Sequence, residues 1–343
     1  MAAGAAGVVF SGLARGQPGA TPAPARLVKP PRLKDGATVG LIAPSGVVDD
    51  AHIEKCVRNL EALGFKVRTS ANIRAQHGGY AGSVEQRLAD LHAMFRDRDV
   101  GAVWAARGGS GCLALLPHID YAAIRRHPKV LVGYSDITPL LIALYRHAGL
   151  VTFHGPVASS MGFDRESTVR AMRAVIMEPR ARTTLEIIPE NLGREAAEPE
   201  YAPRVFRDGR AEGRLVGGNL AVVCAMVGTP HAVQAKGHIL FLEEIGEAPY
   251  RIDRMFTQLR QAGVLSQASG VALGVFQKCE ATDGEPSLTL AQVLDDNLSG
   301  LRVPAAYGFS FGHIAHQVTL PLGVRAALDT RERTITLLEP AVA

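Results

Sequence analysis

The chain has 343 residues, of which 47% are hydrophobic and 20% charged, and this composition is ordinary for a globular protein. A chain of this length can form two packed domains that need no disulfide bonds for stability. The net charge is +4, the 37 basic residues are scattered, and only 11 Phe, 7 Tyr and one Trp are present, which argues against a nucleic-acid partner.

Residues 1–31 are rich in Ala, Gly and Pro and contain little charge. The stretch from Ala2 to Leu13 is similar to the apolar core of a secretory signal, although the basic segment that normally precedes such a core is absent. We therefore expect either a disordered tail or the remnant of an export signal. No later stretch of 18 apolar residues occurs, so no membrane span is predicted.

Residues 32–180 alternate between short apolar runs and segments with helical periodicity, a pattern that predicts an α/β domain with a parallel sheet. Asp49 and Ser83 are expected to cap helices, and Gln86 completes a capping box with Ser83. The expected strands are 37–44, 65–68, 101–106 and 129–133, and the expected helices are 49–63, 83–95 and 137–148.

Residues 181–212 are acidic and weakly periodic, and we expect them to form a linker. The α/β pattern resumes in residues 213–343, which predict a second domain. Its expected elements are helices at 220–226, 252–262 and 288–298, strands at 238–242 and 271–276, and hairpin-like strands within 318–338.

The most informative local segment is Leu131-Val-Gly-Tyr-Ser-Asp-Ile-Thr, in which Ser135 stands between a strand and a helix. This is the position of the nucleophile in a nucleophile elbow, where a tight turn exposes the hydroxyl at the positive end of a helix. The GxSxG pattern is not met, because Ile137 occupies the place of the second glycine. A simple helix N-cap is the alternative interpretation of Ser135.

A glycine-rich segment, Arg107-Gly-Gly-Ser-Gly, follows the expected strand 101–106. Backbone N–H groups of such a loop can turn toward an oxyanion or a carboxylate. A phosphate loop is also conceivable, but neither GxxxxGK[ST] nor GxGxxG is present.

The second half supplies an acid and a base at strand ends. The apolar run from His238 ends in Glu243 and Glu244, and His313 follows a glycine near the end of another apolar stretch. A serine nucleophile needs a base to accept its proton and an acid to orient that base. Ser135, His313 and Glu243 supply these roles, and Glu243 is favoured over Glu244 or Glu247 as the first acid beyond the apolar run.

The sequence gives little support to a metal site or to a catalytic cysteine. The sequence contains no HExxH motif and no tight His/Asp cluster, so we predict neither a metal nor a cofactor. The four cysteines lie far apart without a CxxC pair, and each is expected to be a small buried hydrophobic residue (Cys56, Cys112, Cys224 and Cys279).

Several of these segments, in this order, resemble the LD-carboxypeptidases, a serine peptidase family that includes the muramoyltetrapeptide carboxypeptidases and the microcin C immunity hydrolases. The resemblance covers about Leu33 to Leu338. The matching segments begin at Gly40 (Gly-Leu-Ile-Ala-Pro-Ser-Gly), Ala106 (Ala-Arg-Gly-Gly-Ser-Gly), Gly133 (Gly-Tyr-Ser-Asp-Ile-Thr), Phe153 (Phe-His-Gly-Pro), Gly217 (Gly-Gly-Asn-Leu), Leu242 (Leu-Glu-Glu-Ile-Gly-Glu), Pro249 (Pro-Tyr-Arg-Ile-Asp-Arg), Gly312 (Gly-His) and Leu320 (Leu-Pro-Leu-Gly).

The resemblance implies Ser135 as nucleophile, Glu243 as acid and His313 as base. It also implies an oxyanion hole formed by the backbone N–H groups of Asp136 and of Gly108 or Gly109. Arg107 and Ser110 are candidate substrate-binding residues, and Ser110 stands where the family usually has Tyr, which puts the substrate in question. The implied fold is an N-terminal domain akin to class I glutamine amidotransferases with a smaller, swivelling C-terminal domain.

The implied activity is hydrolysis of an L,D-peptide bond that releases D-alanine from murein tetrapeptide during cell-wall recycling. The rival within the class is a microcin-immunity-like hydrolase of an aminoacyl-nucleotide, and the rival outside it is a two-domain binding module. Only Tyr201 and Phe206 are aromatic in the linker, which disfavours the nucleotide substrate. The resemblance further implies a muropeptide substrate, a homodimer and a cytoplasmic location, with a periplasmic location as the alternative if the N-terminus is an export signal.

Overall fold

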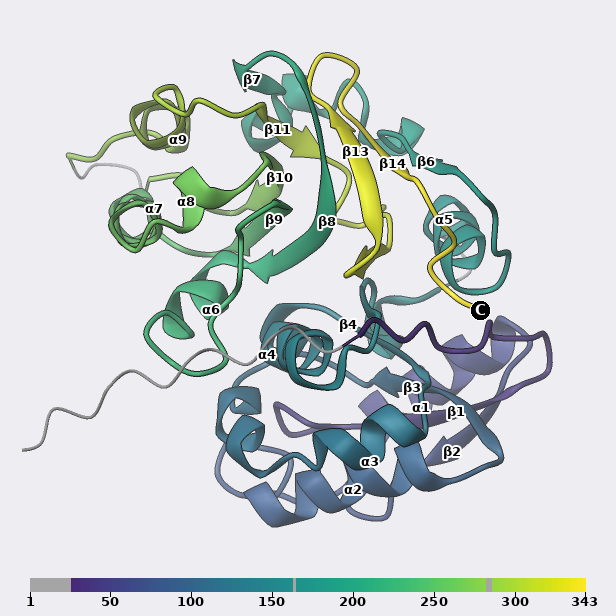
Figure 1. The fold of residues 1–343 in the computed structure, drawn as a ribbon. Coiled ribbons are helices and arrows are strands. Elements are labelled where there is room, and N and C mark those ends of the chain that lie inside the picture. Colours follow the sequence, from purple (N-terminus) through teal and green to yellow (C-terminus); the bar gives the residue numbers. More distant parts are fainter. Residues whose placement is uncertain (1–25, 163–164, 282–285) are drawn as a thin grey trace, which may run out of the picture.

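The computed structural model describes residues 26–162, 165–281 and 286–343. They form two α/β domains, each built on its own sheet, which lie one above the other in Figure 1. The export-signal prediction for the N-terminus falls on residues 1–25 and so lies outside the described residues. In the described part of the chain, no helix has the length and apolar character needed to cross a bilayer.

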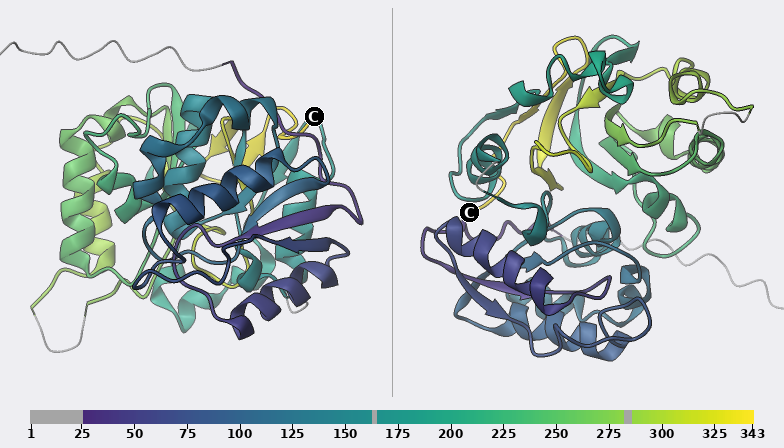
Figure 2. Two further views of the ribbon diagram at one scale, coloured as in Figure 1. Left: turned by 90° about the horizontal axis from the view of Figure 1, so that it is seen from below. Right: turned by 180° about the vertical axis from the view of Figure 1, so that it is seen from behind.

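The N-terminal domain contains a six-stranded sheet with the strand order β12-β5-β4-β3-β1-β2. Strands β1 to β5 are parallel, and β12 returns from the C-terminal part of the chain to pair antiparallel with β5. The strands are β1 (Thr38–Ile42), β2 (Lys66–Thr69), β3 (Val100–Ala105), β4 (Val130–Gly133), β5 (Thr152–His154) and β12 (Leu320–Leu322). Helices lie on both faces of this sheet, as Figure 2 shows.

The helices at 50–62, 84–96 and 138–143 begin within one residue of the predicted positions, whereas those at 121–126 and 166–176 were not predicted. Asp49 accepts a hydrogen bond from the His52 N–H at the start of α1, and Ser83 forms a capping box with Gln86 at the start of α2. The helices are α1 (Asp50–Ala62), α2 (Val84–Arg96), α3 (Tyr121–Arg126) and α4 (Thr138–Ala143), and α5 (Glu166–Ile176) follows them and lies beside β6 of the second sheet (Figure 1).

The C-terminal domain is built on an eight-stranded sheet with the order β6-β14-β13-β8-β9-β10-β11-β7. Its central strands β8 to β11 are parallel, and its outer strands are antiparallel. The strands are β6 (Thr183–Leu185), β7 (Arg204–Arg207), β8 (Arg210–Asn219), β9 (His238–Ile245), β10 (Gly270–Gln277), β11 (Ala305–Phe309), β13 (Arg325–Asp329) and β14 (Thr334–Leu337). The helices are α6 (Leu220–Ala225), α7 (Pro249–Gln261), α8 (Val264–Gln267) and α9 (Leu290–Leu298).

Residues 181–212, predicted as a linker, contribute β6 and β7, the two edge strands of the second sheet. Polar edge strands such as β7 (Arg-Val-Phe-Arg) lack a strong hydrophobic pattern, so their sequence resembles that of a loop. With these two strands the C-terminal sheet has eight strands, against six in the N-terminal sheet.

The described chain also starts to make contacts earlier than the predicted tail of residues 1–31 allows. Val28 forms a parallel bridge with Leu150, and Lys29 forms an ion pair with Glu339 at 2.9 Å. The Ala343 N–H donates to the Pro30 carbonyl. Residues 26–31 are therefore tied both to the N-terminal domain and to the end of the chain. All four cysteines are buried and free, as predicted.

The carboxyl ends of the parallel strands of both sheets meet at the domain boundary. Thr138, at the start of the helix after β4, accepts a hydrogen bond of 3.1 Å from the N–H of Asn219, the last residue of β8. In α/β folds this edge is where loops carry functional side chains. The two domains thus present their functional edges to each other.

Candidate active site

Ser135 lies directly after β4 in a left-handed backbone conformation, with φ of +62°. Non-glycine residues rarely adopt this conformation, which costs on the order of 1–3 kcal/mol and concentrates at functional sites. A helix N-cap has extended backbone, and the residue with that geometry here is Tyr134, whose side chain makes no capping bond. The geometry matches a nucleophile elbow and does not match a cap.

Gly108 of the glycine-rich loop lies against this serine. A Cβ atom at Gly108 would be 2.8 Å from the Ser135 Cβ and 2.9 Å from its Oγ. The absence of a side chain at Gly108 therefore lets the backbone of the loop approach the hydroxyl. Asp136 N also lies near that position, at 3.5 Å from such a Cβ.

The acid–base pair comes from the C-terminal domain. His313 Nδ1 and Glu243 Oε2 are 2.7 Å apart, and the carboxylate is completely buried at the end of β9. Gly312, at φ of +111°, permits this approach, because a Cβ there would be 2.9 Å from the Glu243 Cβ. With Nδ1 bonded to the carboxylate, Nε2 of His313 is left for a substrate or a nucleophile.

The pair is electrostatically coupled. Burial alone lowers the pKa of the His313 imidazole, but the charge and hydrogen bond of Glu243 outweigh burial, so this pKa is raised above its ordinary value. Burial alone raises the pKa of Glu243, and the attraction of His313 reverses that effect, so the carboxyl pKa is lowered. Glu243 is therefore ionised at neutral pH and stabilises an imidazolium at His313.

His313 also lies beside the elbow, because its ring packs against Tyr134 with 4.7 Å between centroids. In the part of the chain that the structure describes, no hydrogen bond joins Ser135 Oγ to His313. The structure thus brings Ser135, Glu243 and His313 into one region and pairs the acid with the base.

The other predicted site residues lie around this centre. The Asp136 carboxylate is buried and accepts hydrogen bonds from Ser45 Oγ and the Cys112 N–H. Gly109 packs against Gly46, Arg107 is exposed, and Ser110 is exposed in the same loop. The bonds to Asp136 hold the first turn after Ser135 against the glycine-rich loop.

The two alternative acids are placed differently from Glu243. Glu244 faces Asn219 Nδ2 and the Ala221 N–H, at 2.9 and 2.8 Å, and burial together with the neighbouring Glu243 charge raises its pKa to about 7. Glu247 forms an i,i+4 ion pair with Arg251 on α7. Successive side chains of a strand point to opposite faces, which accounts for the separation of Glu243 from Glu244.

Sequence reasoning assigned no role to His154 and Asn219, although both stand in the motifs that carried the resemblance. His154, at the end of β5, is fully buried, and burial lowers its pKa to about 4, so it is neutral. Its ring packs between Tyr134 and Phe241, at 6.1 and 5.3 Å between centroids, and so joins the two domains behind the site. Asn219 caps α6 and holds Glu244.

Over the described ranges, no group of three or more His, Cys, Asp or Glu side chains is placed to hold a metal ion.

We expect Gly108→Ala to lower kcat/KM by at least about 100-fold, the range of losses that follow disturbance of an oxyanion donor. The added methyl group would fall within 3 Å of the Ser135 side chain and push the loop away from it. Steady-state kinetics and a melting curve measure the effect. Gly79→Ala is the matched control, because a Cβ at Gly79 meets nothing within 4 Å. Similar losses in both variants would show that the effect of Gly108→Ala is not specific to its contact with Ser135.

A strained serine on one α/β domain and a buried Glu–His pair on the other define the class of two-domain serine hydrolases. Residues 39–155 match the LD-carboxypeptidase N-terminal domain, and residues 212–328 match the LD-carboxypeptidase C-terminal domain. The chain belongs to the LD-carboxypeptidase family, a family of serine peptidases.

Individual relatives agree with this assignment. The chain is 40% identical to a probable murein peptide carboxypeptidase of Bacillus subtilis over 90% of this chain and 94% of the relative. It is 30% identical to the solved muramoyltetrapeptide carboxypeptidase of Oxalobacter formigenes, with a TM-score of 0.74 over 88% and 98% of the two chains. It is 25% identical to the microcin C7 self-immunity protein MccF in complex with aspartyl sulfamoyl adenosine, with a TM-score of 0.81 over 92% and 100%.

Proposed function

We propose that this protein is a serine carboxypeptidase that hydrolyses an L,D-peptide bond and releases the terminal D-alanine of murein tetrapeptide. The observation that supports this most directly is the 2.7 Å Glu243–His313 pair beside a strained Ser135 in a chain of the LD-carboxypeptidase family. A pure binding module has no use for this arrangement, because left-handed strain at a serine and a buried carboxylate both cost stability.

In the proposed reaction, Ser135 Oγ attacks the carbonyl carbon of the L,D bond and transfers its proton to His313 Nε2. Glu243 stabilises the imidazolium that forms. The developing oxyanion accepts hydrogen bonds from the N–H groups of Asp136 and of Gly108 or Gly109. The tetrahedral intermediate expels the amine of D-alanine, which takes the proton from His313, and a water then hydrolyses the acyl-enzyme with His313 again as base.

The nucleophile and the base belong to different domains, so their relative position controls whether the site is assembled. We propose a swivelling movement of the C-terminal domain that brings His313 Nε2 to Ser135 Oγ when substrate binds. The N-terminal domain, with its serine at a strand–helix junction of a parallel sheet, is proposed to resemble the class I glutamine amidotransferases.

The alternative substrate is an aminoacyl-nucleotide, and the likeness to MccF favours it. Stacking on a base needs an exposed aromatic ring. In residues 181–212, Tyr201 is only 4% exposed and is covered by the Arg194 guanidinium at 4.2 Å, and Phe206 is half-buried. This region therefore offers little to a nucleotide base, and a murein peptide has the better support as the substrate.

The test is to incubate the protein with disaccharide-tetrapeptide ending in D-alanine and, in parallel, with aspartyl-adenylate, and to follow both by mass spectrometry. We expect loss of one alanine from the tetrapeptide, and no loss from the same peptide ending in L-alanine. Cleavage of the adenylate alone would assign the alternative function.

We expect full activity after prolonged dialysis against EDTA, because the proposed triad supplies its own nucleophile and base. The measurement is tetrapeptide turnover before and after dialysis. Loss of activity that zinc restores would replace the serine mechanism with a metal-assisted one.

The homodimer and the cytoplasmic location, with the periplasm as its alternative, are further proposals that rest on the family resemblance. Light scattering of the purified protein tests the first. Fractionation of cells that express the gene with its upstream codons tests the second.

A further inference from the structure

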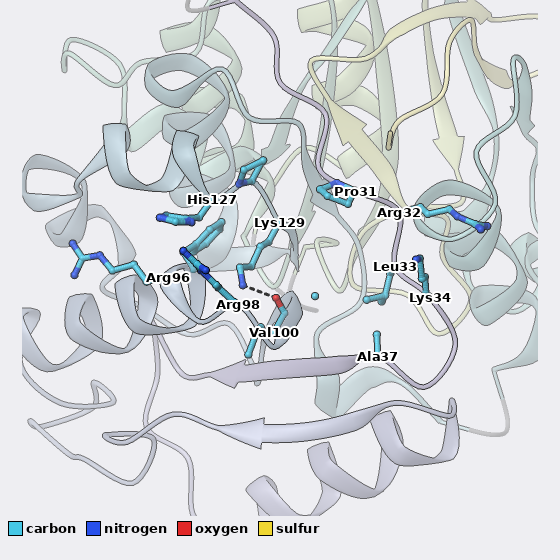
Figure 3. A pocket seen from close by; sticks show the side chains of 13 residues that line it. Pro31, Arg32, Leu33, Lys34, Ala37, Arg96, Arg98, Val100, His127 and Lys129 are labelled. Carbon is cyan, nitrogen blue, oxygen red and sulfur yellow. Dashed lines mark hydrogen bonds between the residues drawn. The ribbon is translucent and has the colours of Figure 1, made fainter.

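A hollow lies on the N-terminal domain at the amino ends of its parallel strands, at the opposite end of β4 from Ser135 (Figure 3). Its volume is about 380 Å³, and its walls are residues 31–34, 37, 95, 96, 98, 100, 101 and 127–129. These segments precede β1, β3 and β4 or form their first residues. Because Lys129 and Ser135 stand at opposite ends of β4, about 20 Å of extended chain separates the hollow from the proposed active site.

The charged side chains that line this hollow are all cationic. They are Arg32, Lys34, Arg96, Arg98 and Lys129, and His127 lies beside them. No carboxylate is among the described residues of its walls. Figure 3 shows Arg96, Arg98 and Lys129 on one side of the hollow and Arg32 and Lys34 on the other. In this view the guanidinium groups of Arg32 and Arg96 extend away from the middle of the hollow. The hollow is nonetheless lined by cationic residues and by no carboxylate among the described residues, an arrangement that favours an anionic occupant.

The acids nearest in sequence offset this positive charge only in part, since the Asp97 and Asp99 carboxylates raise the pKa of Lys129 against the larger effect of its burial. Asp97 and Asp99 both pair with Arg68 of β2, and neither lines the hollow. Arg96 alone has an acidic partner, Asp120, at 3.6 Å. Arg32, Lys34 and Arg98 are exposed and form no ion pair with a carboxylate in the described part of the chain.

Lys129 places a buried ammonium group in the wall of the hollow. Only 7% of this residue is exposed, and its Nζ donates to the carbonyl oxygens of Asp97 and Val100. An ammonium has three protons, so one more donor is left beyond these two bonds. Burial lowers the pKa of Lys129, and this effect outweighs the attraction of the Asp97 and Asp99 carboxylates.

The rest of the wall is apolar, with Leu33, Ala37, Phe95 and Pro128 among its residues. The volume lies in the range of pockets for small organic ligands and exceeds what one inorganic ion fills. The hollow thus combines a cationic side with apolar surface, which suits an anion that carries an apolar group.

We propose that this hollow binds a small organic phosphate, a phosphomonoester with a ring or other apolar substituent. A phosphomonoester carries about −1.5 to −2 charges at pH 7 and presents three acceptor oxygens. Those oxygens can meet cations from several directions, whereas a planar carboxylate presents only two. The guanidinium group of arginine and the ammonium group of lysine bind phosphate in this way.

Isothermal titration of the full chain with phenyl phosphate, in a phosphate-free buffer at low salt, tests the proposal. We expect saturable binding of one ligand per chain, and a Kd at least about tenfold weaker in the double variant Lys34→Ala/Arg98→Ala, because each lost cation weakens a charge-assisted hydrogen bond. Both side chains are exposed, so this variant should fold normally. Arg58→Ala is the matched control, because Arg58 is an exposed cation on α1 outside the hollow.

Three outcomes would overturn the proposal. The first is no saturable binding down to a Kd of about 1 mM. The second is equal weakening in Arg58→Ala and in the double variant, which would indicate a general charge effect. The third is phthalate, a ring dicarboxylate, binding as tightly as phenyl phosphate. Unchanged binding in Ser135→Ala, with normal tetrapeptide turnover in the double variant, separates this hollow from the proposed active site.

Discussion

Ser135→Ala is expected to lower the kcat of tetrapeptide hydrolysis by about 10⁴- to 10⁶-fold, the loss typical of removing a triad nucleophile. The fold should be preserved, because the hydroxyl is not used as a helix cap and alanine has the same Cβ at the strained position. We therefore expect the melting temperature to change by less than about 3 °C, which corresponds to roughly 1 kcal/mol in a domain of this size.

Ser160→Ala serves as the matched control. Ser160 lies next to the site, but the only side-chain contact of its hydroxyl in the described residues is a 3.5 Å approach to the Tyr134 hydroxyl. This control should keep kcat within about tenfold of the unaltered protein, since weak contacts contribute little. If Ser135→Ala retains more than about a tenth of the activity, Ser135 is not the nucleophile.

Glu243→Gln is expected to lower kcat by about 10⁴-fold, the scale seen when a triad acid becomes an amide and the base takes the wrong tautomer. The pH profile gives a second readout. His313 can act as a base only when its ring is neutral, and its pKa is raised. The fall of kcat/KM on the acid side of the pH profile should therefore have an apparent pKa above the ordinary histidine value of about 6.5. Removing the carboxylate charge leaves burial as the main effect, so in Glu243→Gln this limb should move to lower pH.

Glu244→Gln is the matched control for this experiment, because Glu244 is the next residue and is also buried, yet it contacts Asn219 and Ala221 and not His313. We expect it to keep kcat within about tenfold and to lose about 1–3 kcal/mol of stability, because a buried N–H loses its acceptor. Equal kinetic losses in the two variants would mean that the acid has been assigned to the wrong face of β9.

The proposed substrate depends on features beyond the triad. Ser110 stands in the glycine-rich loop where the family usually has Tyr, and it is exposed in the structure. The comparison of D-alanine, L-alanine and adenylate substrates therefore tests the pocket, whereas the Ser135 and Glu243 variants test the chemistry.

The sequence by itself determined strands β1 to β4, helices α1 and α2 and the start of α4 to within a few residues, but it predicted neither α3 nor β5. The reason is local: apolar runs closed by glycine or proline, and caps such as Asp49 and Ser83, specify these elements without long-range contacts. It also singled out Ser135, Glu243 and His313, because acids, bases and nucleophiles at the carboxyl ends of apolar strands are conspicuous in an α/β pattern.

Only the tertiary structure decided which segments far apart in sequence share a surface. β6 and β7 are strands because they pair with β14 and β11, and their own polar sequences do not require it. The cationic hollow joins residues 31–37 to residues 127–129 through packing that no local pattern encodes. A strand's hydrogen bonds and a pocket's walls both depend on partners distant along the chain, so their identity is set by the whole fold.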